Sequence, residues 1–312
     1  MNTAVVELAD VGKRYGGTAV VSRVSLSCGK GEVIGLVGHN GAGKSTLFKM
    51  MLGIINADEG EIRLFGETSG SKWFRDVRRD IGYLPENVAL YDNLSGLETL
   101  QFFARLKFAD PRSCASLLDR VGLGQAMHRA VREYSKGMSQ RLGFAQALLG
   151  NPRLLLLDEP TNGLDPEATH AFYDLLGQLK AAGTTVILSS HLLAEIQSRV
   201  DRLLVMADGR LVVRGTVAAL AAAAKLPASV QVFPRGDAVE RVFGTLVAAG
   251  FEPSRQPDGR LQLALPPGRR IVFLRTLAWL ADALLDYSIT EATLEDVFLQ
   301  HLRGAPAREG KL

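Results

Sequence analysis

The chain of 312 residues is 47% hydrophobic and 22% charged, a composition that excludes a fibrous or disordered protein. Its net charge of +3, from 36 basic and 33 acidic residues, is too nearly balanced to indicate a nucleic-acid partner. The most apolar stretches are interrupted at Arg214, Arg275 and Asp282, which excludes a run of about 20 apolar residues crossing a bilayer. Any membrane role therefore requires a partner.

The N-terminal stretch lacks the pattern of a secretory signal peptide, because its apolar residues alternate with polar ones. Two cysteines, Cys28 and Cys114, stand in unrelated patterns and form neither a disulfide framework nor a metal motif. We therefore expect a protein of the reducing cytoplasm.

Short alternating patterns at 5–11, 22–28 and 61–66 predict antiparallel strands. Between them, the apolar run at 32–37 predicts a strand that leads into GHNGAGKST and then into an amphipathic helix. This stretch satisfies G-x-x-x-x-G-K-[ST], a loop whose N–H groups and following helix dipole bind phosphates. The predicted nucleotide-binding residues are Gly38, Asn40, Gly41, Gly43, Lys44, Ser45 and Thr46. Of these, Lys44 would reach the β- and γ-phosphates of a nucleoside triphosphate, and the Ser45 hydroxyl would hold Mg²⁺.

Helical spacing of leucines and aromatics at 94–108 and 111–123 predicts a helical subdomain over about 87–150. We interpret the apolar stripes of these helices as buried core in preference to a surface that binds a partner. Residues 134–141, YSKGMSQR, then read as the start of another helix, with Ser135 and Gly137 near its N-terminus. Free N–H groups and the positive end of a helix dipole favour an anion, so this is a second candidate anion site.

The run LLLLDEP at 154–160 predicts a buried parallel strand that ends in two adjacent carboxylates. Ligands bind at the carboxyl ends of such strands, so Asp158 would hold Mg²⁺ and Glu159 would accept a proton from the attacking water. A further strand pattern, TTVILSS, ends at His191 in the same way. A neutral imidazole there could bind the γ-phosphate.

The composition changes after the alanine-rich stretch at 218–229, and a second unit begins near residue 227. Strand patterns alternate there with helix patterns at 238–251, 269–285 and 293–303, which predicts a small α/β domain. It carries no phosphate loop or acidic pair, so we expect a dimerisation or regulatory role for it.

With these motifs in order, residues 1 to about 220 resemble the nucleotide-binding subunits of ATP-binding-cassette (ABC) transporters. The resemblance implies a P-loop ATPase with a RecA-like parallel core, an antiparallel β edge and a helical subdomain at 1–225, followed by the small α/β domain at 226–312. The implied cofactors are ATP and Mg²⁺, and the implied activity is ATP hydrolysis that drives a membrane subunit.

The resemblance also assigns further residues. Tyr15 matches the aromatic that stacks on adenine, Asp165 closes the loop that crosses the dimer interface, and GYLPE at 82–86 matches the loop that contacts the membrane subunit. Residues 134–138 occupy the place of the family signature, usually LSGGQ. The resemblance implies a head-to-tail homodimer in which the signature residues Ser135, Lys136, Gly137 and Met138 face the ATP of the other copy.

The sequence departs from the family pattern at three positions. Glu86 replaces a glutamine; it keeps an oxygen ligand for Mg²⁺ but adds a negative charge near the triphosphate, so we expect weaker nucleotide binding or slower turnover. Lys136 and Met138 replace a glycine and a glutamine of the signature. The alternative is that these departures are features of a subfamily without mechanistic effect.

Within the family, GYLPEN at 82–87, YSKGM at 134–138 and the appended domain resemble NosF-type ATPases, the subunits of a complex that matures the copper sites of nitrous-oxide reductase. This resemblance implies a position on the inner face of a bacterial plasma membrane, bound to a NosY-type membrane subunit and through it to a periplasmic NosD-type protein. We expect no direct copper binding and no nucleic-acid partner. Two alternatives are the ATPase of a drug- or antibiotic-type exporter and, from another class, a soluble cassette ATPase acting on ribosomes or DNA.

Overall fold

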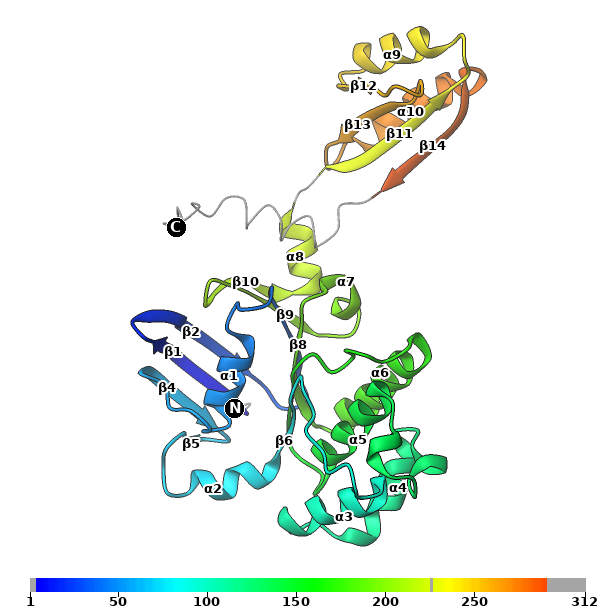
Figure 1. Cartoon of the computed structure of the whole chain (residues 1–312). Coiled ribbons are helices and arrows are strands. Elements are labelled where there is room, and N and C mark those ends of the chain that lie inside the picture. Colours follow the sequence, from blue (N-terminus) through cyan, green and yellow to red (C-terminus); the bar gives the residue numbers. More distant parts are fainter. Residues whose placement is uncertain (1–3, 225–226, 291–312) are drawn as a thin grey trace. The chain divides into compact units, whose positions relative to one another are not determined.

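The computed structural model describes residues 4–224 and 227–290. The chain divides between Val217 and Ala218 into two compact units (Figure 1). The sequence pattern places this boundary later, after the alanine-rich helix α8 (Val217–Ala224). Across the described residues, no helix is both long enough and apolar enough to cross a membrane.

A six-stranded sheet forms the centre of the first unit. In sheet order its strands are β10 (Arg210–Thr216), β9 (Arg202–Ala207), β3 (Val33–Val37), β8 (Thr185–Ser190), β7 (Leu154–Leu157) and β6 (Ile81–Leu84). All neighbours from β9 to β6 are parallel, and β10 joins the edge antiparallel. Every residue of β3, β7 and β8 is buried, as near-continuous apolar runs predict for parallel strands covered on both faces. The predicted parallel core is confirmed.

The antiparallel strands form a sheet of their own, in the order β2 (Thr18–Cys28), β1 (Val6–Tyr15), β4 (Glu59–Leu64) and β5 (Glu67–Thr68). Helix α1 (Lys44–Met51) joins the two sheets, because its buried residues Leu47, Phe48, Met50 and Met51 belong to one core cluster with residues of both. The predicted antiparallel edge is therefore a second sheet that packs on the parallel sheet through α1, while β10 is an antiparallel strand at the edge of the six-stranded sheet itself (Figure 1).

The remaining helices of the first unit are α2 (Phe74–Val77), α3 (Gly96–Leu106), α4 (Cys114–Arg120), α5 (Lys136–Leu148), α6 (Pro166–Ala181) and α7 (Leu193–Ile196). Helices α3, α4 and α5 fall in the predicted helical subdomain, and α3 begins with a capping box between Ser95 and Glu98. The helix predicted over 111–123 is shorter: Pro111–Ser113 form a 3₁₀ turn before α4.

The second unit is β11 (Ala228–Pro234), α9 (Val239–Ala248), β12 (Ser254–Arg255), β13 (Leu261–Leu265), α10 (Arg270–Trp279) and β14 (Leu284–Thr290). The sheet order β12-β13-β11-β14 is antiparallel throughout, which is the split β-α-β-β-α-β arrangement. The helix predicted over 269–285 ends at Trp279, because Leu284 already pairs with β11 as part of β14. The helix predicted at 293–303 lies outside the described residues.

Candidate nucleotide-binding site

A cleft of about 360 Å³ lies where strands of the parallel sheet end. Because parallel strands end at the same edge, β3 delivers the phosphate loop there and β7 delivers the two adjacent carboxylates. The cleft is lined by Val20, His39, Asn40, Gly41, Ala42, Gly43, Lys44, Ser45, Thr46, Glu86, Asp158 and Glu159. Most of the residues singled out in the sequence are therefore brought together, and Val20, His39 and Ala42 join them.

Two glycines are required by the geometry of the loop. Gly43 precedes α1 with φ 103°, a left-handed conformation that residues with a side chain rarely adopt. A Cβ on Gly38 would lie 2.4 Å from the Met206 carbonyl oxygen, so no side chain fits there. The glycines thus allow the loop to turn tightly beside β9 and to present backbone N–H groups at the start of α1.

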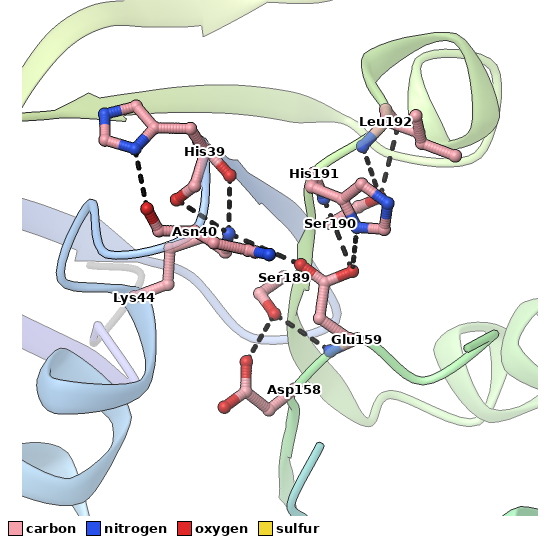
Figure 2. A network of polar contacts seen from close by, with 10 residues as sticks. His39, Asn40, Lys44, Asp158, Glu159, Ser189, Ser190, His191 and Leu192 are labelled. Atoms are coloured by element: carbon pink, nitrogen blue, oxygen red, sulfur yellow. Dashed lines mark hydrogen bonds and ion pairs between the residues drawn. The ribbon is translucent and has the colours of Figure 1, made fainter.

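Lys44 lies buried at the bottom of the cleft, with 6% of its surface exposed. Its Nζ donates to the Gly38 carbonyl and lies 3.4 Å from the His39 carbonyl oxygen and 3.3 Å from Glu159 Oε1 (Figure 2). A buried cation is stable only with such partners. Phosphate oxygens of a bound nucleotide would replace these partners as acceptors for the ammonium.

Glu159 connects the phosphate loop to the end of β8. Its Oε2 lies 2.8 Å from His191 Nδ1, while Oε1 is buried without a hydrogen bond beside the Lys44 ammonium (Figure 2). An acceptor in that state is suited to a water molecule, as the proposed role in accepting a proton requires. His191 is about half exposed and is not among the residues that line the cleft; its contact with Glu159 links it to the cleft.

The residues also fit a divalent cation. The carboxylate of Asp158 is buried, one of its oxygens is bound by the Ser189 hydroxyl at 2.6 Å, and Glu86 lines the same cleft. Both carboxylates also influence Tyr83 of the neighbouring strand β6: burial first, and then the negative charges of Asp158 and Glu86, raise the pKa of its hydroxyl to about 12. Oxygen ligands of this kind suit Mg²⁺, which in such sites is shared between the protein and the phosphates of the nucleotide. Together with Ser45, they would hold the ion that neutralises charge during phosphoryl transfer.

The signature residues lie elsewhere on the first unit and do not line the cleft as the structure describes it. Ser135 is the N-cap of α5, and its hydroxyl accepts from the Met138 N–H at 3.2 Å. The Lys136 side chain lies over Gly163, in the loop at 162–165 that precedes α6, and a Cβ added to Gly163 would come within 2.8 Å of it. Asp165 caps α6 by accepting from the Ala168 N–H at 2.8 Å.

Tyr15 is half exposed at the end of β1 and is absent from the cleft lining. Four residues of the cleft and its surroundings were not among those predicted from the sequence: Val20, His39, Ala42 and Ser189. The signal for Ser189 was present, since a polar residue in a strand buried along its whole length needs a buried partner.

Comparisons with known proteins agree with this architecture. Residues 21–162 match the family model described as ABC transporter. The bacitracin transport ATP-binding protein BcrA of Enterococcus faecalis is 40% identical over 210 residues, which cover 67% of this chain and 68% of that protein. The lantibiotic transport ATP-binding protein SrtF of Streptococcus pyogenes is 35% identical over 208 residues, covering 67% of this chain and 89% of that protein.

Among solved structures, an ATP-binding subunit of an ABC transporter superposes with a TM-score of 0.64 at 31% identity, covering 70% of this chain and 92% of that one. A dimeric bacterial ABC transporter cassette superposes equally well, with a TM-score of 0.64 at 25% identity, covering 68% of this chain and 98% of that one. ABC ATPases of this family dimerise and act with a membrane subunit. The chain thus belongs to the ABC transporter family as an ATP-binding subunit, an enzyme that hydrolyses ATP with Mg²⁺ as cofactor.

Proposed function

We propose that two copies of this chain bind ATP between them, head to tail. The observation that carries this proposal is the separation of two anion-binding elements on one unit. The cleft around Lys44 would hold phosphates from one side. The N-terminus of α5, with exposed Ser135 as its N-cap, does not line that cleft. Each element would then complete the site of the other copy, so that bound ATP holds the two copies together and hydrolysis weakens their contact.

The experiment uses Glu159→Gln, which removes the proton acceptor and keeps the shape of the side chain. We expect hydrolysis to fall at least a hundredfold and the protein to become dimeric in light scattering with saturating MgATP. The double variant Glu159→Gln with Ser135→Glu is the control, because its new charge repels the γ-phosphate of the other copy. It should bind ATP and remain monomeric. A Glu159→Gln protein that stays monomeric with bound ATP would contradict the proposal.

We further propose that the complex is of the NosDFY type, in which a NosF-type dimer on the cytoplasmic face drives a NosY-type membrane subunit in the maturation of nitrous-oxide reductase. Support comes from the sequence pair Glu86-Asn87, from YSKGM at 134–138 and from the appended second unit. Glu86 lines the ATP cleft, so this distinguishing residue lies where it can affect turnover. The membrane subunit would dock at the 82–86 loop. Further along the chain, exposed Tyr91 packs edge to face against Phe102 of α3 and would offer it aromatic surface.

A second candidate is the ATPase subunit of an antibiotic-type exporter. It is favoured by the relatives, two of which are named for bacitracin and lantibiotic transport. The two candidates differ in the partners that they require, because an exporter needs a membrane subunit and no periplasmic maturation protein.

Purification of a tagged chain from its native host in mild detergent, followed by mass spectrometry, separates the candidates. A multi-span membrane protein recovered together with a NosD-like periplasmic protein supports the NosDFY type. A membrane subunit recovered alone supports the exporter, and recovery of ribosomes supports the soluble class of ATPase. A tagged Lys44→Ala chain, which should fold but bind ATP poorly, tests whether the association depends on nucleotide.

A further inference from the structure

Ser189, the fifth residue of β8, is a buried polar residue that no motif accounts for. It is fully buried, and its hydroxyl lies between Asp158 and Glu159, the two acidic residues that follow β7 (Figure 2). The hydroxyl is 2.6 Å from Asp158 Oδ1 and 2.9 Å from the backbone nitrogen of Glu159. One side chain from β8 thus contacts both residues of the acidic pair.

The direction of both hydrogen bonds is determined by the chemistry of the groups. An ionised carboxylate can only accept and a backbone N–H can only donate, so the hydroxyl gives its single proton to Asp158 and accepts from Glu159. The 2.6 Å distance is typical of a hydroxyl that donates to a carboxylate. The hydroxyl therefore links the side chain of one acidic residue to the backbone of the next.

This link holds a backbone conformation that is unfavourable by itself. Glu159 has φ 49°, in the left-handed region that non-glycine residues avoid. Such a conformation persists when surrounding contacts hold it in place, and it is frequent at functional sites. Here the Asp158 N–H donates to the Leu84 carbonyl at 2.8 Å, and the Glu159 N–H donates to Ser189.

We propose that Ser189 is a positioning residue for ATP hydrolysis. Its hydroxyl binds one oxygen of Asp158 and leaves the second oxygen for the metal ion. Through the Glu159 backbone it also holds the carboxylate of that residue between Lys44 and His191. In this position the carboxylate would accept a proton from the attacking water. Partners of this kind behind a metal ligand change metal affinity or activity about 10- to 100-fold when they are lost.

The test compares Ser189→Ala with two controls. Ser189→Thr keeps the hydroxyl. Thr185→Val removes a hydroxyl from the other end of the same strand; Thr185 is equally buried, donates to the Gly29 carbonyl at 3.1 Å and accepts from the Gly31 N–H at 3.0 Å. Thr185→Val therefore loses the same kinds of contact as Ser189→Ala, one donated and one accepted hydrogen bond, at a position away from the cleft.

Three quantities are measured on the full chain: the affinity for Mn²⁺ by electron paramagnetic resonance with a non-hydrolysable ATP analogue, kcat at saturating Mg²⁺, and the affinity for ATP without metal. We expect Ser189→Ala to weaken Mn²⁺ binding at least tenfold and to lower kcat at least tenfold, with metal-free ATP affinity within threefold of the wild type. Ser189→Thr and Thr185→Val should stay within threefold in all three.

A purely structural role predicts a different result. Ser189→Ala would then lose thermal stability like Thr185→Val and keep its Mn²⁺ affinity and kcat, which would overturn the proposal. If Ser189→Ala does not fold, Ser189→Cys replaces it, because a thiol is a weaker donor with longer bonds. Its Mn²⁺ affinity should fall at least threefold, and an unchanged affinity would overturn the proposal equally.

Discussion

Three carboxylates and one lysine share the nucleotide cleft. Glu86, Asp158 and Glu159 line it, and Lys44 is the ammonium beside them. Like charges close together repel one another and also repel a triphosphate, most strongly where water is excluded. The roles proposed for Asp158 and Glu159 require a charge, whereas Glu86 stands where the family pattern has an uncharged amide.

Glu86→Gln should therefore bind ATP two- to tenfold more tightly or raise the basal kcat by a similar factor, because one negative charge leaves the surroundings of the phosphates. Titration with a fluorescent ATP analogue and steady-state hydrolysis, both at saturating Mg²⁺, measure the two quantities. Glu252→Gln, the same change at an exposed position in the second unit, is the control for net charge. If neither affinity nor rate increases, Glu86 is a subfamily feature without effect on the nucleotide.

The two ends of helix α3 are fixed in different ways, and its C-terminal end is attached to the parallel sheet. Its start is fixed locally, since the Ser95 N–H donates to Glu98 Oε2 at 2.8 Å. Its end is fixed by a distant contact, in which Lys107 donates to the Ile81 carbonyl of β6 at 3.0 Å. Burial lowers the pKa of Lys107 to about 8, although the Asp80 charge acts in the opposite direction.

This lowered pKa predicts a pH dependence of stability. Below about pH 8 Lys107 is protonated in both states, and burial of its charge is unfavourable; between about 8 and 10.5 the unfolded chain holds a proton that the folded chain has released. The free energy of unfolding of the wild type, relative to Lys107→Met, should therefore rise over this range by roughly 1 to 3 kcal/mol.

Urea unfolding followed by circular dichroism at several pH values measures this difference for the first unit. Lys49→Met, a substitution of an exposed lysine on α1, is the matched control and should differ from the wild type by a constant amount. A constant difference for Lys107→Met as well would show that its amine is not desolvated in solution.

At the scale of the whole molecule, each unit has a core of its own. The first unit packs both of its sheets around α1, and the second packs one face of its sheet on α9 and α10 through residues such as Val230, Leu246 and Phe273. Separate cores allow separate unfolding, since cooperativity depends on shared contacts.

Calorimetry of the full chain should accordingly show two transitions. A non-hydrolysable ATP analogue with Mg²⁺ at a hundred times its dissociation constant should stabilise only the first unit, by about 2.7 kcal/mol, because only that unit holds the nucleotide cleft. Lys44→Ala should show both transitions and no such shift. A single transition that moves as a whole would contradict the separation of the two cores.

The sequence by itself determined the parts of this protein that depend on contiguous residues. The loop from Gly38 to Ser45 could be predicted because its turn, its N–H groups and its helix start follow one another along the chain. The acidic pair after β7 could be predicted because an apolar run ends there, and the capping box of α3 needs only Ser95 and Glu98. The same local patterns led to the correct class of fold and enzyme.

Only the tertiary structure decided which distant groups meet. The contacts of Glu159 with Lys44 and His191, and the link from Ser189 to Asp158, join strands whose neighbours are set by sheet order and not by sequence distance. The antiparallel strands likewise form their own layer, and Leu284 belongs to β14 instead of a helix, because pairing with a distant strand outweighs local propensity. Side-chain partners across strands follow from the packing of the whole unit, and no local pattern encodes them.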